Sequence, residues 1–277
     1  MKHFKLFAVI ATLLCITTEV LAGLVLNPQR IVLQDRERSA SLKLLNTAEE
    51  MGRYQIFFEH KFMKEDGSIV NIENPEEGGP YAGDMIRYSP RRVDIKAGGS
   101  QTIRLAVRRP KDLADGEYIS HLVLKQIPNK VEVAETNSSN AAKDSEVELA
   151  LAVQPVLKLA IPVIVRKGNL ETKADIDNIV PIKNDNGLVT DVHFTLHREG
   201  DFSLYGNVEL YEKSESGLGK RIGFIRGIAL YDPTVKRLVR IHLDEAKNLS
   251  GKPLRLRFEE NEKYGGSNVI EKDITFD

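Results

Sequence analysis

Apolar and polar residues alternate with a period of two along most of the chain. In Thr102-Ile103-Arg104-Leu105-Ala106-Val107, the aliphatic side chains of Ile103, Leu105 and Val107 stand at every second position. Successive side chains of a β-strand point to opposite faces of a sheet, so this pattern puts one face in a core and the other in water. The sequence therefore predicts a protein built from half-buried strands.

Similar runs recur through the first half of the chain, with turn signals between them. The turns are Asp66-Gly67, Gly78-Gly79-Pro80, Gly98-Gly99 and Asp115-Gly116, and the strand-like runs are 24–33, 39–45, 54–60, 93–95, 102–107 and 117–125. Short strands at this spacing, with no convincing amphipathic helix, are typical of a β-sandwich. We expect a first sandwich in this part of the chain.

A second set of runs follows Lys167-Gly168, which we interpret as a hinge. These runs are 188–196, 204–212, 222–230, 235–243, 254–259 and 269–276. After removal of an N-terminal signal, about 255 residues remain, a length that suits two domains. The sequence predicts an all-β fold with one domain at 23–167 and a second β-sandwich at 168–277.

The segment 148–166 is predicted to be one long strand. Its odd positions carry mostly large aliphatic side chains, namely Leu149, Leu151, Val153, Leu157, Leu159 and Ile161. Pro155 has no N–H to donate to a ladder, which favours the edge of a sheet. The preceding segment 129–145 is polar and predicts a long loop that leaves this edge accessible. An aliphatic edge strand is a template for pairing with another chain, although the same row could close the chain's own core.

The first 22 residues have the pattern of a secretory signal peptide. Lys2 and Lys5 precede an apolar run, and Val20-Leu21-Ala22 supplies small residues for cleavage near Ala22. The run is too short for a transmembrane helix. The only cysteine, Cys15, lies inside this segment, so the mature chain has neither a disulfide nor a cysteine–zinc site.

Composition and motifs argue against catalysis and against nucleic-acid binding. The net charge is -1 with 29% charged residues, so both signs are mixed over the surface. Basic residues form only isolated pairs such as Arg91-Arg92, without an aromatic platform. No nucleophile elbow, paired acid and base or convincing metal-ligand set is present. We expect no cofactor, no metal, no small-molecule substrate and no enzymatic activity.

Several segments resemble the PapD-like periplasmic pilus chaperones. Asn27-Pro28-Gln29-Arg30-Ile31-Val32-Leu33 is similar to the first strand of that family, and Tyr88-Ser89-Pro90 to its proline-containing turn. Asp115-Gly116-Glu117-Tyr118-Ile119 and the run 149–166 resemble its last two strands of the first domain, and Asn261-Glu262-Lys263-Tyr264-Gly265-Gly266 a motif near the end of the second. The resemblance implies two immunoglobulin-like domains in a boomerang arrangement.

The resemblance also implies roles for particular residues. Arg30 would anchor the carboxylate terminus of a bound pilin, and Glu117, Arg166 and Glu262 would form ion pairs that fix the angle between the domains. The residues Leu149, Leu151, Val153, Leu157 and Leu159 would be donated to the pilin as a strand. The family's second anchor is a lysine, but the matching position here is Pro162. Either Arg30 works with a different cation, such as Lys158 or Arg166, or the carboxylate is held differently.

The function implied by this resemblance is that of a divergent chaperone of the chaperone-usher pathway. It would bind pilin or fimbrial subunits in the periplasm by donor strand complementation and deliver them to an outer-membrane usher. In the free protein, the aliphatic row would lie open at the edge, which could also pair with a second copy of the chain. The alternative is an exported, adhesin-like binding module with two sandwich domains.

Overall fold

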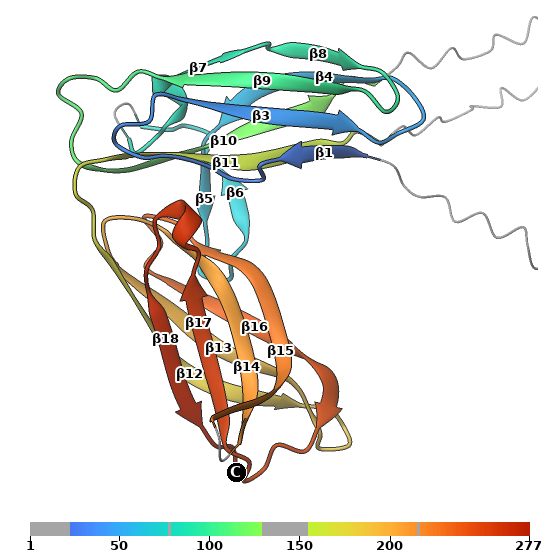
Figure 1. The fold of residues 1–277 in the computed structure, drawn as a ribbon, viewed down its shortest axis with the longest axis vertical. Helices are drawn as coiled ribbons and strands as arrows, with labels where there is room; N and C mark the ends of the chain where they lie inside the picture. The colour runs from blue at the N-terminus through green and yellow to red at the C-terminus, as the bar shows by residue number, and fades with distance from the viewer. Residues whose placement is uncertain (1–22, 77–78, 129–154, 215–216) are drawn as a thin grey trace, which may run out of the picture.

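The computed structural model describes residues 23–76, 79–128, 155–214 and 217–277. Within these ranges the chain forms eighteen strands and two short 3₁₀ turns, η1 (Gly83–Met85) and η2 (Glu262–Tyr264). The strands build two layered bodies that meet at an angle (Figure 1). The all-β architecture with two sandwich domains, expected from the alternating pattern, is confirmed. No helix of the described residues is long and apolar enough to cross a bilayer.

The first domain consists of two sheets with a shared core. One sheet holds four strands in the order β1 (Leu24–Asn27), β3 (Ser39–Asn46), β9 (Ser100–Val107) and β7 (Ile86–Ser89). The other holds five in the order β2 (Ile31–Leu33), β11 (Lys158–Lys167), β10 (Gly116–Gln126), β4 (Gly52–Glu59) and β8 (Arg92–Ile95). The inward residues of both sheets, among them Leu42, Ile103 and Val163, are fully buried in one cluster.

The run 24–33, expected as one strand, is divided between these two sheets. β1 pairs with β3 in one sheet, and β2 pairs in parallel with β11 in the other. The change of sheet occurs at residues 28–30, where Pro28 follows a cis peptide bond. Proline cannot donate to a ladder, so the strand is interrupted here. Arg30 therefore lies immediately before β2, at the edge of the five-stranded sheet.

The second domain is one curled sheet of seven strands. Their order is β12 (Thr172–Lys183), β13 (Val189–Gly200), β16 (Lys236–Lys247), β15 (Gly217–Leu230), β14 (Leu204–Ser214), β17 (Leu254–Glu260) and β18 (Val269–Ile274). β15 and β16 are joined at only one register pair, Gly223 with Leu243. The outermost strands approach each other: Lys272 of β18 forms an ion pair with Asp175 of β12 over 2.8 Å. The sheet thus folds over a core centred on Phe194 and Phe258.

A hairpin of the first domain reaches across to the second (Figure 1). It consists of β5 (Lys61–Met63) and β6 (Ile69–Asn71), with a turn closed by hydrogen bonds between Lys64 and Ser68 and between Gly67 and Lys64. Met63 is 4% exposed and belongs to the core cluster of the second domain. The carbonyl of Met63 accepts a hydrogen bond from the Thr234 hydroxyl, and Leu238 N–H donates to the Glu65 carbonyl over 2.7 Å. The hairpin, called the bridging hairpin below, is therefore part of the joint.

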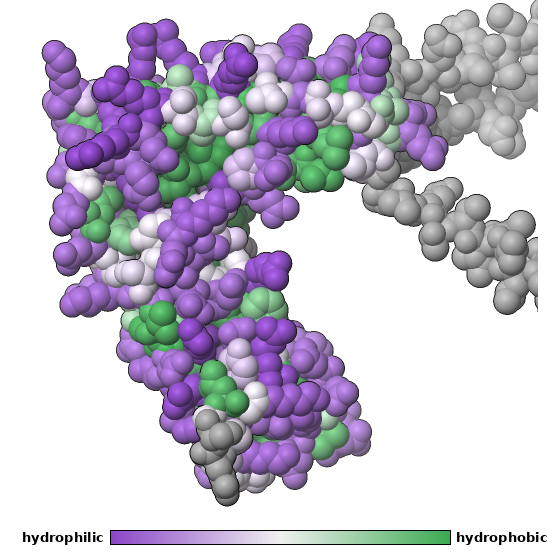
Figure 2. Space-filling view, in the orientation of Figure 1, coloured by the Kyte–Doolittle hydropathy of each residue, from purple (hydrophilic) through white to green (hydrophobic). Residues whose placement is uncertain are grey.

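The surface visible in Figure 2 is mostly hydrophilic on both domains. Hydrophobic side chains appear there as separate patches between charged and polar ones. This distribution agrees with the mixed charge of the sequence, since the apolar residues of the strands are largely turned toward the two cores.

The long strand expected at 148–166 is shorter in the structure, and its position in the sheet differs in part. β11 begins at Lys158, and Leu149, Leu151 and Val153 lie outside the described residues. β11 is also not an edge strand over its whole length, because β2 covers Val163–Val165. Its edge opposite β10 is unpaired, within the described chain, from Lys158 to Pro162.

Candidate functional site

The joint between the domains contains a pocket of about 280 Å³. Side chains from the start of β2, from β11, from the bridging hairpin and from the second domain line it. The lining residues are Gln29, Arg30, Met63, Gly67, Ile69, Pro162, Tyr205, Gly227, Ala229, Tyr231 and Arg237. This pocket brings together groups that are far apart in the sequence, and it lies at the end of the unpaired stretch of β11.

Arg30 is held in this pocket by tyrosines of the second domain. It is 5% exposed, and its guanidinium carbon lies 3.9 Å from the centre of the Tyr205 ring and 5.0 Å from that of Tyr231. Its Nη2 donates to the Tyr231 hydroxyl over 2.6 Å. Aromatic faces attract a cation and orient it, but they do not neutralise it.

The charge of Arg30 has no acidic partner among the residues that the structure describes. Its Nε is buried and makes no hydrogen bond. Burial raises the pKa of Tyr231, although Arg30 opposes that shift, so the phenol stays protonated at neutral pH. Because a buried, unpaired guanidinium N–H is unfavourable, Arg30 is suited to receive an anion from outside the chain.

Lys158 does not serve as the second cation beside Arg30. It lies four residues before Pro162 on β11, and its Nζ is 2.6 Å from Glu59 Oε1. Glu59 also pairs with Lys61 at 2.7 Å. The carboxylate of Glu59 therefore holds Lys158 outside the pocket, and Pro162 occupies the lining position on β11. The expectation for Lys158 is corrected by this geometry.

The cation that shares the pocket with Arg30 is Arg237, at the start of β16 in the second domain. No local signal identifies it, since Arg237 belongs to no motif and its neighbours are ordinary strand residues. Only the packing of the bridging hairpin and the second domain around the joint brings it to the pocket.

Glu117 and Arg166 form a buried ion pair on neighbouring strands of the first domain. Arg166 Nε lies 2.8 Å from Glu117 Oε2, and the two side chains are 7% and 0% exposed. The pair also reaches the second domain: Glu117 Oε1 accepts from the backbone N–H of Ser203 over 2.9 Å and from the Ser203 hydroxyl. Arg166 Nη1 donates to the Tyr264 carbonyl over 2.6 Å. The ion pair of the first domain is thus hydrogen-bonded to the second domain and connects the two.

Glu262, expected as the third member of this network, is not part of it. It is exposed in η2, and no ion pair in the described part of the chain includes it. The backbone carbonyl of Tyr264 takes its place as acceptor for Arg166. Arg166 is therefore also unavailable as a second cation for the pocket.

The odd face of β11 points into the first domain's own core. Ile161, Val163 and Val165 are buried there, and Leu157 and Leu159 are partly buried at its margin. On the even face, Lys158 and Ala160 are exposed. The expectation that the aliphatic row lies open in the free protein is therefore wrong for this part of the strand.

His121 of β10 is buried behind the joint. It is 4% exposed, both ring nitrogens lack hydrogen-bond partners, and its ring meets that of Tyr231 edge to face at 6.0 Å. Burial, followed by the charges of Lys61 and Arg30, lowers the pKa of His121 from 6.5 to about 4, while Glu59 acts in the opposite direction. His121 is therefore neutral at neutral pH.

This neutral histidine predicts a pH-dependent loss of stability. The unfolded chain binds the proton near pH 6.5 and the folded chain only near pH 4, so stability falls as the pH decreases through this window. The full difference amounts to about 3 kcal/mol. His121→Phe should lose correspondingly less stability than the unmodified protein when urea unfolding is compared at pH 7 and pH 4. Equal losses in both proteins would contradict a buried, neutral His121.

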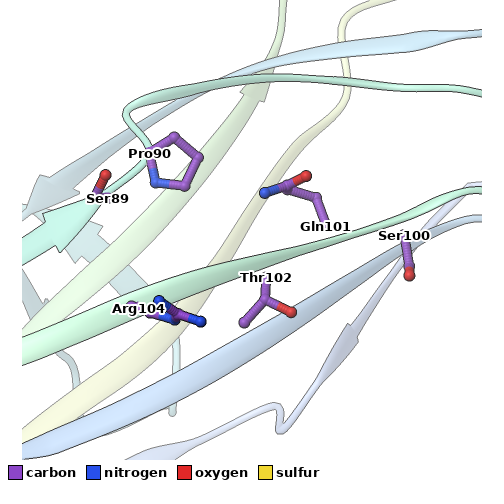
Figure 3. A pocket seen from close by; sticks show the side chains of 6 residues that line it. All are labelled: Ser89, Pro90, Ser100, Gln101, Thr102 and Arg104. Atoms are coloured by element: carbon purple, nitrogen blue, oxygen red, sulfur yellow. The ribbon is translucent and has the colours of Figure 1, made fainter.

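A larger concavity, of about 550 Å³, lies on the four-stranded sheet of the first domain. Polar side chains of β9 and the end of β7 line it, namely Ser89, Ser100, Gln101, Thr102 and Arg104, together with Pro90 (Figure 3). Ser100, Gln101, Thr102 and Arg104 are exposed. No buried, unpaired polar atom in the described residues belongs to this surface, which distinguishes it from the pocket at the joint. No group of three or more potential metal ligands was found among the described residues.

No protein-family model and no curated protein matches the chain. Among solved structures, the YadV chaperone is similar with a TM-score of 0.46 and 13% identity, over 91% of this chain and 100% of that one. The CupB2 chaperone of Pseudomonas aeruginosa gives 0.45 and 14%, over 90% and 98%. A chain of the CsuC–CsuE complex, a chaperone–tip adhesion subunit pre-assembly complex from archaic chaperone-usher Csu pili of Acinetobacter baumannii, gives 0.45 and 15%, over 90% and 98%.

Proposed function

We propose that this chain is an exported, non-catalytic chaperone of the pilus-assembly type, which binds pilin-like subunits at the edge of β11 and at Arg30. The observation that carries the proposal is the junction of these two features. The unpaired stretch of β11 from Lys158 to Pro162 ends at a pocket in which a buried arginine lacks an acidic partner.

The unpaired edge supports binding by strand addition. β10 pairs with β11 along its length, but β2 covers only Val163–Val165 on the other side. The backbone groups of the exposed stretch can therefore pair with an extended segment of another protein. Such a segment would add to the five-stranded sheet in line with β2.

The position of Arg30 sets the direction of that segment. β2 runs parallel to β11 and begins at Ile31, opposite Val163. A strand in the same line that places its C-terminal carboxylate at Arg30 must therefore approach β2 from the Lys158 side and run parallel to β11. A charge-assisted hydrogen bond to the carboxylate would then fix the register of the added strand.

The aliphatic side chains of the row would pack against the core of the bound subunit. Leu157 and Leu159 already lie at the margin of the first domain's core, so a subunit with an open sandwich could continue that core outward. Leu149, Leu151 and Val153, which precede them with the same spacing, are proposed to fill the subunit's groove. Delivery to an outer-membrane usher and cleavage near Ala22 in the periplasm complete the proposal.

Arg30→Gln tests the proposal in a bacterial periplasm in which tagged chain is expressed together with candidate pilins. Loss of one charge-assisted hydrogen bond, about 1.5–3 kcal/mol, should reduce recovery of the subunit at least tenfold. Arg92→Gln, which changes an exposed arginine of the same domain, should leave recovery unchanged.

Thermal melting of Arg30→Gln separates loss of binding from loss of folding. Unchanged subunit recovery with this variant would remove Arg30 from the mechanism. If the unmodified chain recovers no exported subunit at all, the adhesin-like alternative is favoured over a chaperone.

A further inference from the structure

The pocket at the joint is positively charged and contains no acid. Arg30 and Arg237 line it, and none of the other described lining residues is aspartate or glutamate. Neither arginine forms an ion pair within the described residues. Two guanidinium groups beside one small space repel each other unless an anion lies between or near them.

Arg237 is seated by the bridging hairpin and by β15. Its Nη1 donates to the Ala229 carbonyl over 2.5 Å. The turn of the hairpin covers the rest of the group: a Cβ on Gly67 would come within 2.4 Å of Arg237 Nε, and Gly67 has a φ of +83°. The positive φ favours glycine, and a larger residue there would displace the guanidinium, so the hairpin turn lies directly against Arg237.

The guanidinium of Arg237 is desolvated without full compensation. Its Nε is buried and makes no hydrogen bond, as is also true of Arg30 Nε. Burial lowers the pKa of Arg237, and Tyr231 and Asp66 only partly oppose this shift. Removing a charge from water without a partner is unfavourable, and a carboxylate in the pocket would supply that partner.

We propose that Arg237 is the second anchor of the pocket, so that a single carboxylate is held between Arg30 of the first domain and Arg237 of the second. This inference rests on the proposed function for the identity of its ligand, the C-terminal carboxylate of an extended polypeptide. The cation comes from the second domain because Pro162 occupies the lining position on β11 and has no group that could bind an anion.

The remaining lining describes the residue that would carry this carboxylate. Met63, Ile69, Pro162 and Ala229 form apolar walls. A final residue with an apolar side chain fits these walls, whereas an amidated terminus carries no negative charge for the two arginines to bind. Arg30 and Arg237, together called the arginine clamp, come from different domains. The clamp therefore exists only when the joint is assembled.

The test uses a fluorescein-labelled ten-residue peptide of alternating serine and valine that ends in valine. It is prepared once with a free C-terminal carboxylate and once as the amide, and binding to the full mature chain is followed by anisotropy. The unmodified protein should bind the acid at least tenfold more tightly than the amide. Arg237→Gln and Arg30→Gln should each remove most of this preference, and the double variant should bind acid and amide equally.

Two further variants control for charge and for folding. Arg237→Lys keeps the charge and should retain part of the preference, whereas Arg226→Gln, at an exposed arginine of the same domain, should retain all of it. An Arg237→Gln protein that melts normally and still prefers the acid as the unmodified protein does would overturn the proposal. So would equal or absent binding of both peptides by the unmodified protein.

The outcome is separable from that of the proposed function. If the acid is preferred through Arg237 but no exported subunit is recovered from the periplasm, the clamp stands and the chaperone assignment fails. If subunits are recovered and Arg237 has no effect on the preference for the acid, the chaperone assignment stands and the clamp fails.

Discussion

Replacing Arg166 by alanine is expected to lower the free energy of unfolding by about 3–5 kcal/mol and to loosen the joint between the domains. The change leaves the fully buried carboxylate of Glu117 without its cation and removes the hydrogen bond to the Tyr264 carbonyl. Urea unfolding measures the first effect, and small-angle scattering of the native protein measures the second as a broader distribution of shapes.

Three controls make this expectation specific. Arg255→Ala breaks an ion pair with Asp273 whose side chains are 28% and 50% exposed, and such exposed pairs contribute about 0–1 kcal/mol. Glu262→Gln should have no effect on the joint, because Glu262 is outside the network. Replacing both Glu117 and Arg166 by leucine and methionine should restore part of the stability, since no buried charge is then left unpaired. A loss below about 1 kcal/mol for Arg166→Ala would contradict the buried pair.

Met63→Asp is the second change with a large expected effect. The aspartate would place a carboxylate in the second domain's core, where Met63 is 4% exposed, at a cost of several kcal/mol. We expect a lower melting temperature and a hairpin released from the second domain, with the scattering profile broadened as for Arg166→Ala.

Phe62→Asp is the matched control, since Phe62 precedes Met63 on the same strand and is 36% exposed. It should melt close to the unmodified protein. Similar melting temperatures for the two variants would show that the hairpin does not hold the joint.

The alternating pattern was sufficient to predict strands but not their partners. The run 24–33 has the pattern of one strand, yet Pro28 divides it between two sheets. The alternation in 149–161 predicts two faces without showing which one meets the core, and the structure turns Ile161 inward. Burial depends on the neighbouring sheet, which a local pattern does not contain.

The site was predictable only where residue type and local motif coincide. Arg30 lies in a recognisable segment, and the structure places it at the joint. The resemblance implied an ion pair for Glu262, but the backbone carbonyl of Tyr264 accepts the hydrogen bond of Arg166 instead, and backbone groups leave no signal in residue identity. Arg237 lines the pocket where it packs against Gly67 of the other domain, which is a tertiary relation without a local sequence pattern.

The bridging hairpin has a consequence for how the chain acquires its structure. Met63, together with Ile119 and Ile164 of the first domain, packs in the same cluster as the core of the second. A chain that emerges N-terminus first completes its first domain while these apolar side chains still face water. They become buried when the second domain packs against them. An isolated first domain would therefore expose these apolar side chains to water, and such an exposed face favours aggregation.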